Sequence, residues 1–378
     1  MYDVGIKPLA ESMRDSEIAQ IWVCDDLSAS GSPKKLQEWF KRLKERGKEY
    51  GYIPKPGKCH IISKDPNVSL IFKEEIERGE LCVSEGTRYL GAPIGTGEFK
   101  NCYLKEKVRE HIKRLQKLTL LAKTSPHAAY FLHQTCMQHE LTYLQRTQNL
   151  EEHITAVEFE RKKLVEALFG NKILNQNKWK EISLPTRHGG LGINVSSLIE
   201  DSNTQYRKCE VVTQDLKNKL INQDYTLPMK HDLKELRKSQ EKCYKAKAEE
   251  LRTMESEVAQ KQRMVELSSK CTNSWLHAMP ISAQRRYMSK NEFQDALSLR
   301  YGMQIKGVAL KCACGDTNTT IHANNCKLGG YITRRHDAMR NFLQQKAAIV
   351  YNDTEIEPHL QETETHALQQ RVNPQDKS

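Results

Sequence analysis

The chain has 378 residues, and its 59 lysines and arginines exceed its 48 aspartates and glutamates, which gives a formal net charge of +11. This basic balance favours an anionic partner, and we expect RNA and DNA ahead of a membrane surface. There is no apolar run of about eighteen residues and no apolar signal core after Met1, which excludes the common transmembrane and secreted classes. We therefore expect an intracellular protein of the nucleus or the cytoplasm.

The cysteines point to a metal cluster rather than to disulfides. The chain has 11 cysteines, an odd number, and most of them are scattered. Free thiols in a reducing compartment, with one local metal cluster, fit this pattern better than a disulfide framework does. The length alone predicts roughly two or three domains.

Two adjacent acids follow the first predicted strand. An apolar run from Ile18 to Val23 predicts this strand, and Asp25 and Asp26 come just after it, before several turn residues. Mg²⁺ prefers hard oxygen ligands such as carboxylates, and two such ions can clamp the attacking and leaving oxygens of a phosphoryl transfer. The ordinary alternative for an Asp-Asp pair is a solvated turn without metal.

A basic amphipathic helix comes next. Apolar residues at helical spacing between Leu36 and Leu43 predict this helix, and lysines and arginines surround them. A Gly- and Pro-rich segment, residues 51–59, then leads into a short strand that begins at His60. Lys58 lies in this segment, and without further context it is an ordinary solvated side chain.

Residues 99–200 read as helical. The pattern is helical from Asn101 to about Arg146, and Ser125-Pro126 interrupts it. Residues 126–170 predict two further helices, and a Gly-rich turn at 185–192 closes the unit. The helical segment that begins at Asn101 carries six cations that can neutralise phosphates or simply be solvated: Lys105, Lys107, Arg109, Lys113, Arg114 and Lys117.

Polar residues dominate two later segments. The stretch 230–269 is rich in Lys, Glu, Arg and Gln, and its apolar residues are too sparse for a strict heptad. We expect one or two exposed helices there that bridge domains, rather than a coiled coil. The tail beyond His359 is polar, and we expect it to be disordered.

One group of residues has the composition of a zinc site. Three cysteines and a histidine lie within fifteen residues, and they can close a tetrahedron on Zn²⁺. The site would be structural, because four protein ligands leave no open position. The alternative is a loop of reduced free thiols. The four residues are Cys312, Cys314, His322 and Cys326.

The order of these motifs resembles that in the reverse transcriptases of non-LTR retrotransposons. The resemblance rests on the Asp-Asp turn, on GYIPKPGKC at residues 51–59, and on TRYLGAPIG at 87–95. The sequence LPTRHGGLGI at 184–193 is similar to a signature found beyond the thumb in this family. The Cys-Cys-His-Cys knuckle resembles that of elements with a restriction-like endonuclease.

The resemblance implies an α+β amino-terminal part followed by a mostly α-helical thumb and linker, with a small zinc knuckle. It implies five regions: a partial palm at 1–98, a helical thumb-like region at 99–200, a helical linker at 201–305, the zinc knuckle with the start of an endonuclease-like region at 306–345, and a polar tail at 346–378.

The resemblance also implies RNA-templated DNA synthesis by a nucleotidyltransferase. Asp25 and Asp26 would be two of three Mg²⁺-binding acids, and Lys58 would protonate the departing pyrophosphate. The third acid belongs to a motif upstream of this sequence, and the endonuclease residues belong downstream, so we expect an inactive C-terminal fragment. A primer grip would lie at Tyr89, Leu90 and Gly91.

Two other interpretations remain open at this stage. The chain can be a non-catalytic, zinc-stabilised nucleic-acid-binding protein derived from a mobile element, and the missing third acid favours this. A purely structural helical scaffold would require the cysteine cluster to be empty. Cobalt or zinc uptake separates the second interpretation from the third.

Overall fold

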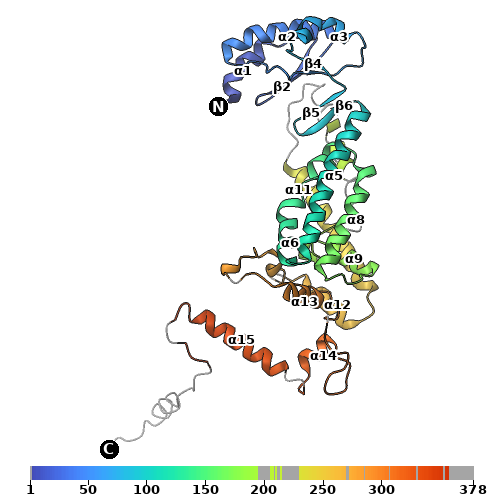
Figure 1. The fold of residues 1–378 in the computed structure, drawn as a ribbon, viewed down its shortest axis with the longest axis vertical. Helices are drawn as coiled ribbons and strands as arrows, with labels where there is room; N and C mark the ends of the chain where they lie inside the picture. The colour runs from blue at the N-terminus through green and yellow to red at the C-terminus, as the bar shows by residue number, and fades with distance from the viewer. Residues whose placement is uncertain are drawn as a thin grey trace, which may run out of the picture. The chain divides into compact units, whose positions relative to one another are not determined.

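The computed structural model is mostly helical with small sheets (Figure 1). It describes residues 2–194, 205–207, 209–210, 213–214, 230–269, 272–284, 286–305, 307–328, 331–351 and 354–356. Two compact units divide the chain, Met1–Gln294 and Asp295–Ser378. The five regions expected from the sequence are finer than this division and stay a prediction. None of the described helices is long and apolar enough to cross a membrane.

The first unit begins with a helix, a hairpin and a second helix. These elements are α1 (Tyr2–Ser12), β1 (Ala19–Val23), β2 (Asp26–Ser30), α2 (Pro33–Gly47) and the 3₁₀ turn η1 (Lys48–Tyr50). Strands β1 and β2 pair antiparallel with Val23 opposite Asp26, so Cys24 and Asp25 form the turn between them. The strand-and-turn expected from the sequence is therefore confirmed.

Helix α2 holds this hairpin in place through its apolar face. Trp39 and Leu43 are buried in one cluster with Met13 of the preceding segment and with Ile18 just before β1. The Trp39 indole N–H donates to the Met13 carbonyl oxygen at 3.1 Å, so the polar atom of this buried ring is satisfied. Burial of each such side chain contributes about 1.5–3 kcal/mol to the free energy of unfolding.

Two further small sheets follow. Their elements are β3 (His60–Ile61), α3 (Val68–Ile71), α4 (Lys73–Glu77), β4 (Cys82–Val83), β5 (Gly86–Tyr89) and β6 (Ala92–Gly95). Strands β3 and β4 pair parallel, whereas β5 and β6 form an antiparallel hairpin. This hairpin turns at Leu90 and Gly91, whose φ angles of 46° and 86° are those of a type I′ turn.

A helical bundle makes up the middle of the first unit. Its elements are α5 (Gly97–Ala122), α6 (Pro126–Leu132), the π-helical turn η2 (His133–Met137), α7 (Thr142–Thr147), α8 (Glu151–Leu168), α9 (Gln176–Ser183) and the 3₁₀ turn η3 (Thr186–His188). Thr96 caps α5 by accepting the Phe99 amide at 3.2 Å. The break at Ser125-Pro126 is confirmed, because α6 begins at Pro126.

The expected number of helices between residues 126 and 170 is wrong. Two helices were expected there, and the structure has three, because α6 ends in the π-helical turn η2 before α7 begins. Helices α5 and α8 lie side by side (Figure 1). Their facing residues are fully or almost fully buried: Leu104, Val108, Leu115, Ile154, Val157 and Leu164.

The Gly-rich turn at 189–192 is a close-packed structural element. The Leu191 amide donates to the Ile182 carbonyl at 2.9 Å, and the Leu191 carbonyl accepts from the Tyr130 hydroxyl at 2.9 Å. A Cβ atom on Gly190 would lie 1.8 Å from the Leu184 carbonyl oxygen. The turn therefore fastens the end of α9 to α6, and only glycine fits at position 190.

The polar stretch after residue 230 is helical, but it is not fully exposed. It forms α11 (Lys230–Met254) and α12 (Val258–Leu267), followed by the 3₁₀ turns η4 (Ser274–His277) and η5 (Ser282–Gln284). Ala248, Leu251 and Met264 are buried in a cluster with Leu184. The expectation of exposed bridging helices is wrong here, because the sparse apolar residues gather on one face of each helix.

The second unit contains the cysteine cluster. Helix α13 (Lys290–Arg300) crosses the division between the units, and α14 (Thr320–Asn325) and α15 (Tyr331–Ala347) follow. The tail beyond His359, which was expected to be disordered, lies outside the described residues.

Three histidines are buried in the described helical bundle: His111, His127 and His133. Neither ring nitrogen of His133 has a hydrogen-bond partner among the described residues. Burial, together with the neighbouring Arg161, holds the pKa of His133 well below its usual value. Burial and the charges of Arg161 and Arg114 lower the pKa of His111 to about 3, although its Nδ1 lies 2.7 Å from a Glu140 oxygen. Glu140 also pairs with Arg114, so its carboxylate is shared between two partners.

We expect Gly190→Ala to destabilise the first unit by about 3 kcal/mol, because the new Cβ collides with the Leu184 carbonyl and overpacks a closed turn. Urea unfolding followed by circular dichroism measures the loss. Gly97→Ala is the matched control, because position 97 has open space for a Cβ at the start of α5. Equal midpoints for the two variants would contradict the structural role of the turn.

We expect stability to fall as pH drops below about 6.5, because the unfolded chain then protonates His133 while the folded chain keeps it neutral. Each such histidine contributes at most about 1.4 kcal/mol per pH unit. His133→Leu removes one of these protons and should flatten the loss. Urea midpoints between pH 7.5 and 5 measure the effect, and parallel pH profiles for both proteins would show that His133 does not drive it.

Candidate functional site

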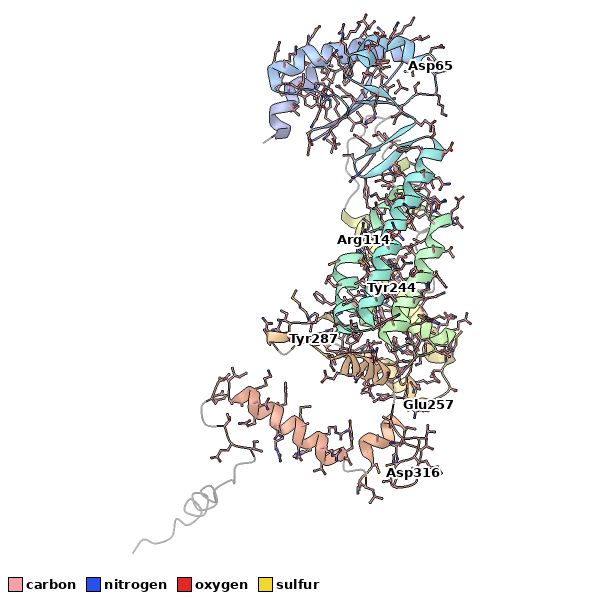
Figure 2. The ribbon with its side chains drawn as sticks, in the orientation of Figure 1. Asp65, Arg114, Tyr244, Glu257, Tyr287 and Asp316 are labelled. Atoms are coloured by element: carbon pink, nitrogen blue, oxygen red, sulfur yellow. The ribbon has the colours of Figure 1, made fainter. Side chains whose placement is uncertain are left out.

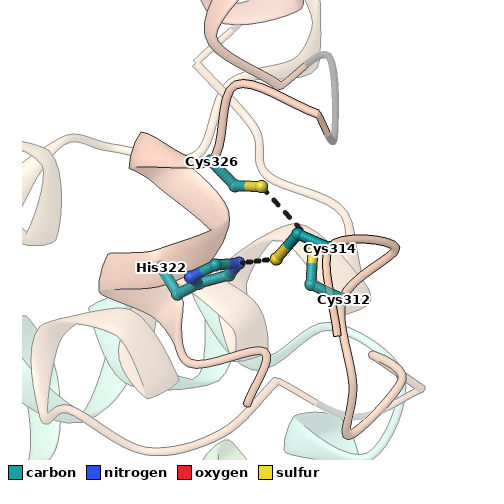
Figure 3. Close-up of side chains that lie close together, drawn as sticks. All are labelled: Cys312, Cys314, His322 and Cys326. Carbon is teal, nitrogen blue, oxygen red and sulfur yellow. Dashed lines mark hydrogen bonds between the residues drawn. The ribbon is translucent and has the colours of Figure 1, made fainter. Parts of the chain in front are cut away.

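The cysteine cluster of the second unit is built by a knuckle turn and a short helix. The Gly315 amide donates to the Cys312 carbonyl at 2.9 Å, and Gly315 has a φ of 93°, which closes the turn that carries Cys312 and Cys314. Thr319 caps α14 by accepting the His322 amide at 3.1 Å. His322 and Cys326 are four residues apart, so they point to the same side as the turn (Figure 3).

The four side chains can hold a metal ion such as zinc. Their ligand atoms all lie within 4.8 Å of one another. Cys314 Sγ lies 3.1 Å from His322 Nε2, and Cys312 Sγ lies 3.6 Å from Cys326 Sγ (Figure 3). Thiolates of a tetrahedral zinc site lie roughly 3.8 Å apart, because Zn–S bonds are about 2.3 Å long. The observed spacing fits this geometry.

The Cys314 thiol of the cluster holds its proton in the absence of an ion. The backbone amide of Asp316 lowers the pKa of Cys314, but burial and the thiols of Cys326 and Cys312 raise it more, to about 11. Bringing several thiolates together is unfavourable unless a cation joins them. Metal uptake therefore has to displace protons from this site.

The acidic hairpin presents Asp25 and Asp26 to solvent. Asp25 lies in the turn between β1 and β2, where Cys24 has a left-handed φ of 53°, and Asp26 begins β2. Both acids are exposed. Among the residues that the structure describes, the cysteine cluster is the one group that gathers three or more potential ligands, so no third acid joins this pair.

A hydrogen-bonded link connects the acidic hairpin to the second hairpin. Ser28 Oγ of β2 lies 3.1 Å from the Tyr89 hydroxyl of β5. The Tyr143 hydroxyl of α7 donates to the Leu90 carbonyl at 2.6 Å, and the Tyr143 ring lies against Gly91. Two of the three residues expected in a primer grip thus face the helical bundle through their backbone. Lys58 is exposed in a turn closed by its own amide and the Lys55 carbonyl.

The six cations on α5 fall into two groups. Lys107, Arg109 and Arg114 form ion pairs with Glu110, Glu106 and Glu140 respectively (Arg114 is labelled in Figure 2). Lys105, Lys113 and Lys117 are exposed, and no ion pair joins them to another described residue. Only the second group is therefore free to meet an external anion.

Comparison with known proteins adds no relative. No family model matches the chain, and searches of curated proteins and of solved structures found no significant match.

Arg161 is a candidate site residue that the sequence motifs did not indicate. Arg161 is only 5% exposed, although it is a cation on a bundle helix. The sequence does indicate its burial, because Arg161 lies at helical spacing between Val157 and Leu164 on the apolar stripe of α8. A charged residue on such a stripe is costly unless it has a partner.

We expect the chain to bind one Co²⁺ or Zn²⁺, and Co²⁺ to show the visible bands of tetrahedral thiolate coordination. Cys314→Ser should abolish these bands, because it removes one of the four gathered ligands. Uptake should release protons and weaken as pH falls, because protons compete for the thiols.

The matched control is Cys243→Ser, which changes an exposed cysteine of α11 and should leave the bands intact. The absence of any metal uptake by the unaltered chain would leave four ordinary side chains and favour a purely structural scaffold.

Proposed function

We propose that this chain is part of a reverse transcriptase of the non-LTR retrotransposon type, and that its own role is to bind RNA or DNA. The observation that carries this proposal is the link between Ser28 and Tyr89, which joins the hairpin of the two acids to the second hairpin. In the family that the sequence resembles, the first hairpin carries metal-binding acids and the second touches the primer strand. Two joined hairpins in this order, followed by a helical bundle, support the same use here.

Chemistry is not proposed for the described residues acting alone. A two-metal phosphoryl transfer needs a complete set of ligands, and no third acid joins Asp25 and Asp26 among the described residues. In a complete polymerase the pair would contribute to a Mg²⁺ site, and Mg²⁺ would offset the charge that develops on the transferring phosphate. A non-catalytic binding protein derived from such an element is the second candidate, and the incomplete acid set favours it.

The cysteine cluster would serve the binding role as a structural zinc site. Four protein ligands leave no open position for a substrate, so the ion would order the knuckle rather than react. The apparent binding free energy of such sites is on the order of 10 kcal/mol, which is enough to fold a short polar segment.

Electrostatics supports binding without sequence preference. The chain carries a net charge of +11, and Lys105, Lys113 and Lys117 give α5 an exposed line of unpaired cations. Lysines in such a line neutralise backbone phosphates and release counterions, which makes the affinity depend on salt rather than on bases.

We expect the purified chain to bind single-stranded RNA and DNA with an affinity that falls steeply with salt. The triple variant Lys105→Gln, Lys113→Gln, Lys117→Gln should weaken binding about tenfold or more and reduce the salt slope by roughly 2 to 3. Fluorescence anisotropy with labelled oligonucleotides, from low to physiological salt, measures both quantities.

The matched control is the double variant Lys107→Gln, Arg109→Gln, which removes ion-paired cations from the same helix and should change binding much less. A salt response that is flat for the unaltered chain would refute the proposed binding. Equal losses of affinity for the two variants would show that total charge determines binding, rather than the positions of Lys105, Lys113 and Lys117.

A further inference from the structure

A groove in the first unit lies beside the helical bundle, and no residue of the acidic hairpin lines it. It has a volume of about 720 Å³ and is walled by η2, α7, the Gly-rich turn and α11. Tyr244, labelled in Figure 2, lines it from α11. The charged side chains along the described part of this groove are five cations against one acid: Arg146, Arg161, Lys180, Arg187, Lys247 and Glu250.

Arg161 is the exceptional member of this set. Its side chain lines the groove, yet the residue is 95% buried, since only 5% of its surface is exposed. No hydrogen bond or ion pair links its guanidinium to another described residue, and its Nε is buried without a partner. Burial of an unpaired guanidinium costs several kcal/mol. Proteins break such local rules chiefly at functional or strained sites, where other interactions offset the cost.

The neighbouring acids on α8 form ion pairs with other cations and not with Arg161. Glu158 and Glu160 on the same helix hold Lys162 at 3.0 Å and Lys163 at 2.9 Å. Burial lowers the pKa of Arg161 to about 10, with Glu158 opposing the shift, so the guanidinium stays charged at neutral pH. A fixed positive charge therefore faces the groove without a counterion from the described protein.

Neutral donors and acceptors complete the lining. Gln134 donates to the Leu191 carbonyl at 3.0 Å, and Gln138 donates to the Gly192 carbonyl at 3.2 Å, which fixes both side chains on the groove wall. The wall there is the π-helical turn η2, a kind of distortion that occurs frequently at functional sites. A polar, cationic and rigid wall suits an anionic ligand with several oxygens, because a planar guanidinium binds such oxygens in pairs.

We propose that this groove is a phosphate-binding site, in which Arg161 holds a backbone phosphate of a single nucleic-acid strand. The inference deepens the proposed nucleic-acid binding, since it assigns that binding a second contact apart from the face of α5. The shared chemistry is the phosphate oxygen, which a free polyphosphate also offers. A strand is favoured because three further cations that no ion pair joins to a described residue, Arg146, Lys180 and Lys247, are spread along the groove, as the charges of a polymer are. The fourth, Arg187, is already paired with Glu241.

The test compares the full chain with Arg161→Met, Arg161→Lys and Lys163→Met. Anisotropy with a labelled single-stranded oligonucleotide should show binding about tenfold weaker for Arg161→Met, with a salt slope smaller by about 1. Arg161→Lys should recover part of the affinity, because it keeps the charge but loses the fork. Lys163→Met should bind within about twofold of the unaltered chain, because its cation is exposed and already paired.

Thermal unfolding distinguishes an arginine that binds a ligand from one that only stabilises the fold. Without ligand, Arg161→Met should melt at a higher temperature than the unaltered chain, because an unpaired buried charge is replaced by an apolar side chain of similar length. The oligonucleotide should raise the midpoint of the unaltered chain more than that of Arg161→Met. A lower midpoint for Arg161→Met together with unchanged affinity would overturn the proposal.

The remaining outcomes separate the two levels of inference. An unaltered chain that binds no oligonucleotide refutes the proposed function itself. An unaltered chain that binds, with Arg161→Met equal to it in affinity and salt slope, refutes only the groove. A third outcome would overturn the assignment to a strand. In it, sodium tripolyphosphate stabilises the unaltered chain but not Arg161→Met, whereas the two proteins bind the oligonucleotide with equal affinity.

Discussion

The packing of α5 against α8 is the constraint on which the first unit depends. Both helices bury continuous apolar faces, and Leu115, Ile154 and Leu164 are completely enclosed. The other elements use this pair as a base: β6 contacts α5, and the Gly-rich turn closes onto α6, which packs against both helices. Polar groups taken into the bundle, such as His111 and Arg161, are there because apolar neighbours on the same helices stabilise the packing.

Local chemistry explains which elements the sequence predicted. The strand β1 with the turn that follows it, and the start of α6 at Pro126, each follow from a few adjacent residues. Tertiary packing decided the elements that were missed. Ala248 and Leu251 look too sparse to form a core, and they become one only because Leu184 lies opposite them.

The candidate sites also divide into those that the local sequence predicts and those that only tertiary packing brings together. The cysteine cluster was predictable because its ligands lie within fifteen residues, so sequence spacing fixes most of its geometry. The ion pairs of Lys107 and Arg109 were within reach of a helical-spacing argument, whereas that of Arg114 with Glu140 depends on a distant segment. The groove at Arg161 joins residues from Gln134 to Leu251, and no local pattern brings these together.

The π-helical turn η2 gives the chain one surplus residue at the point where α6 ends. A π turn holds one residue more than the α-helical turn it replaces, and both complete about one full turn. Deleting a single residue between Leu132 and Gln138 would therefore restore a regular helix and leave the facing of the elements after it nearly unchanged. The loss would fall on contacts made from within the turn, such as that of Gln134 with the Leu191 carbonyl. This segment is thus the place where the bundle can shorten by one residue without displacing the helices that follow.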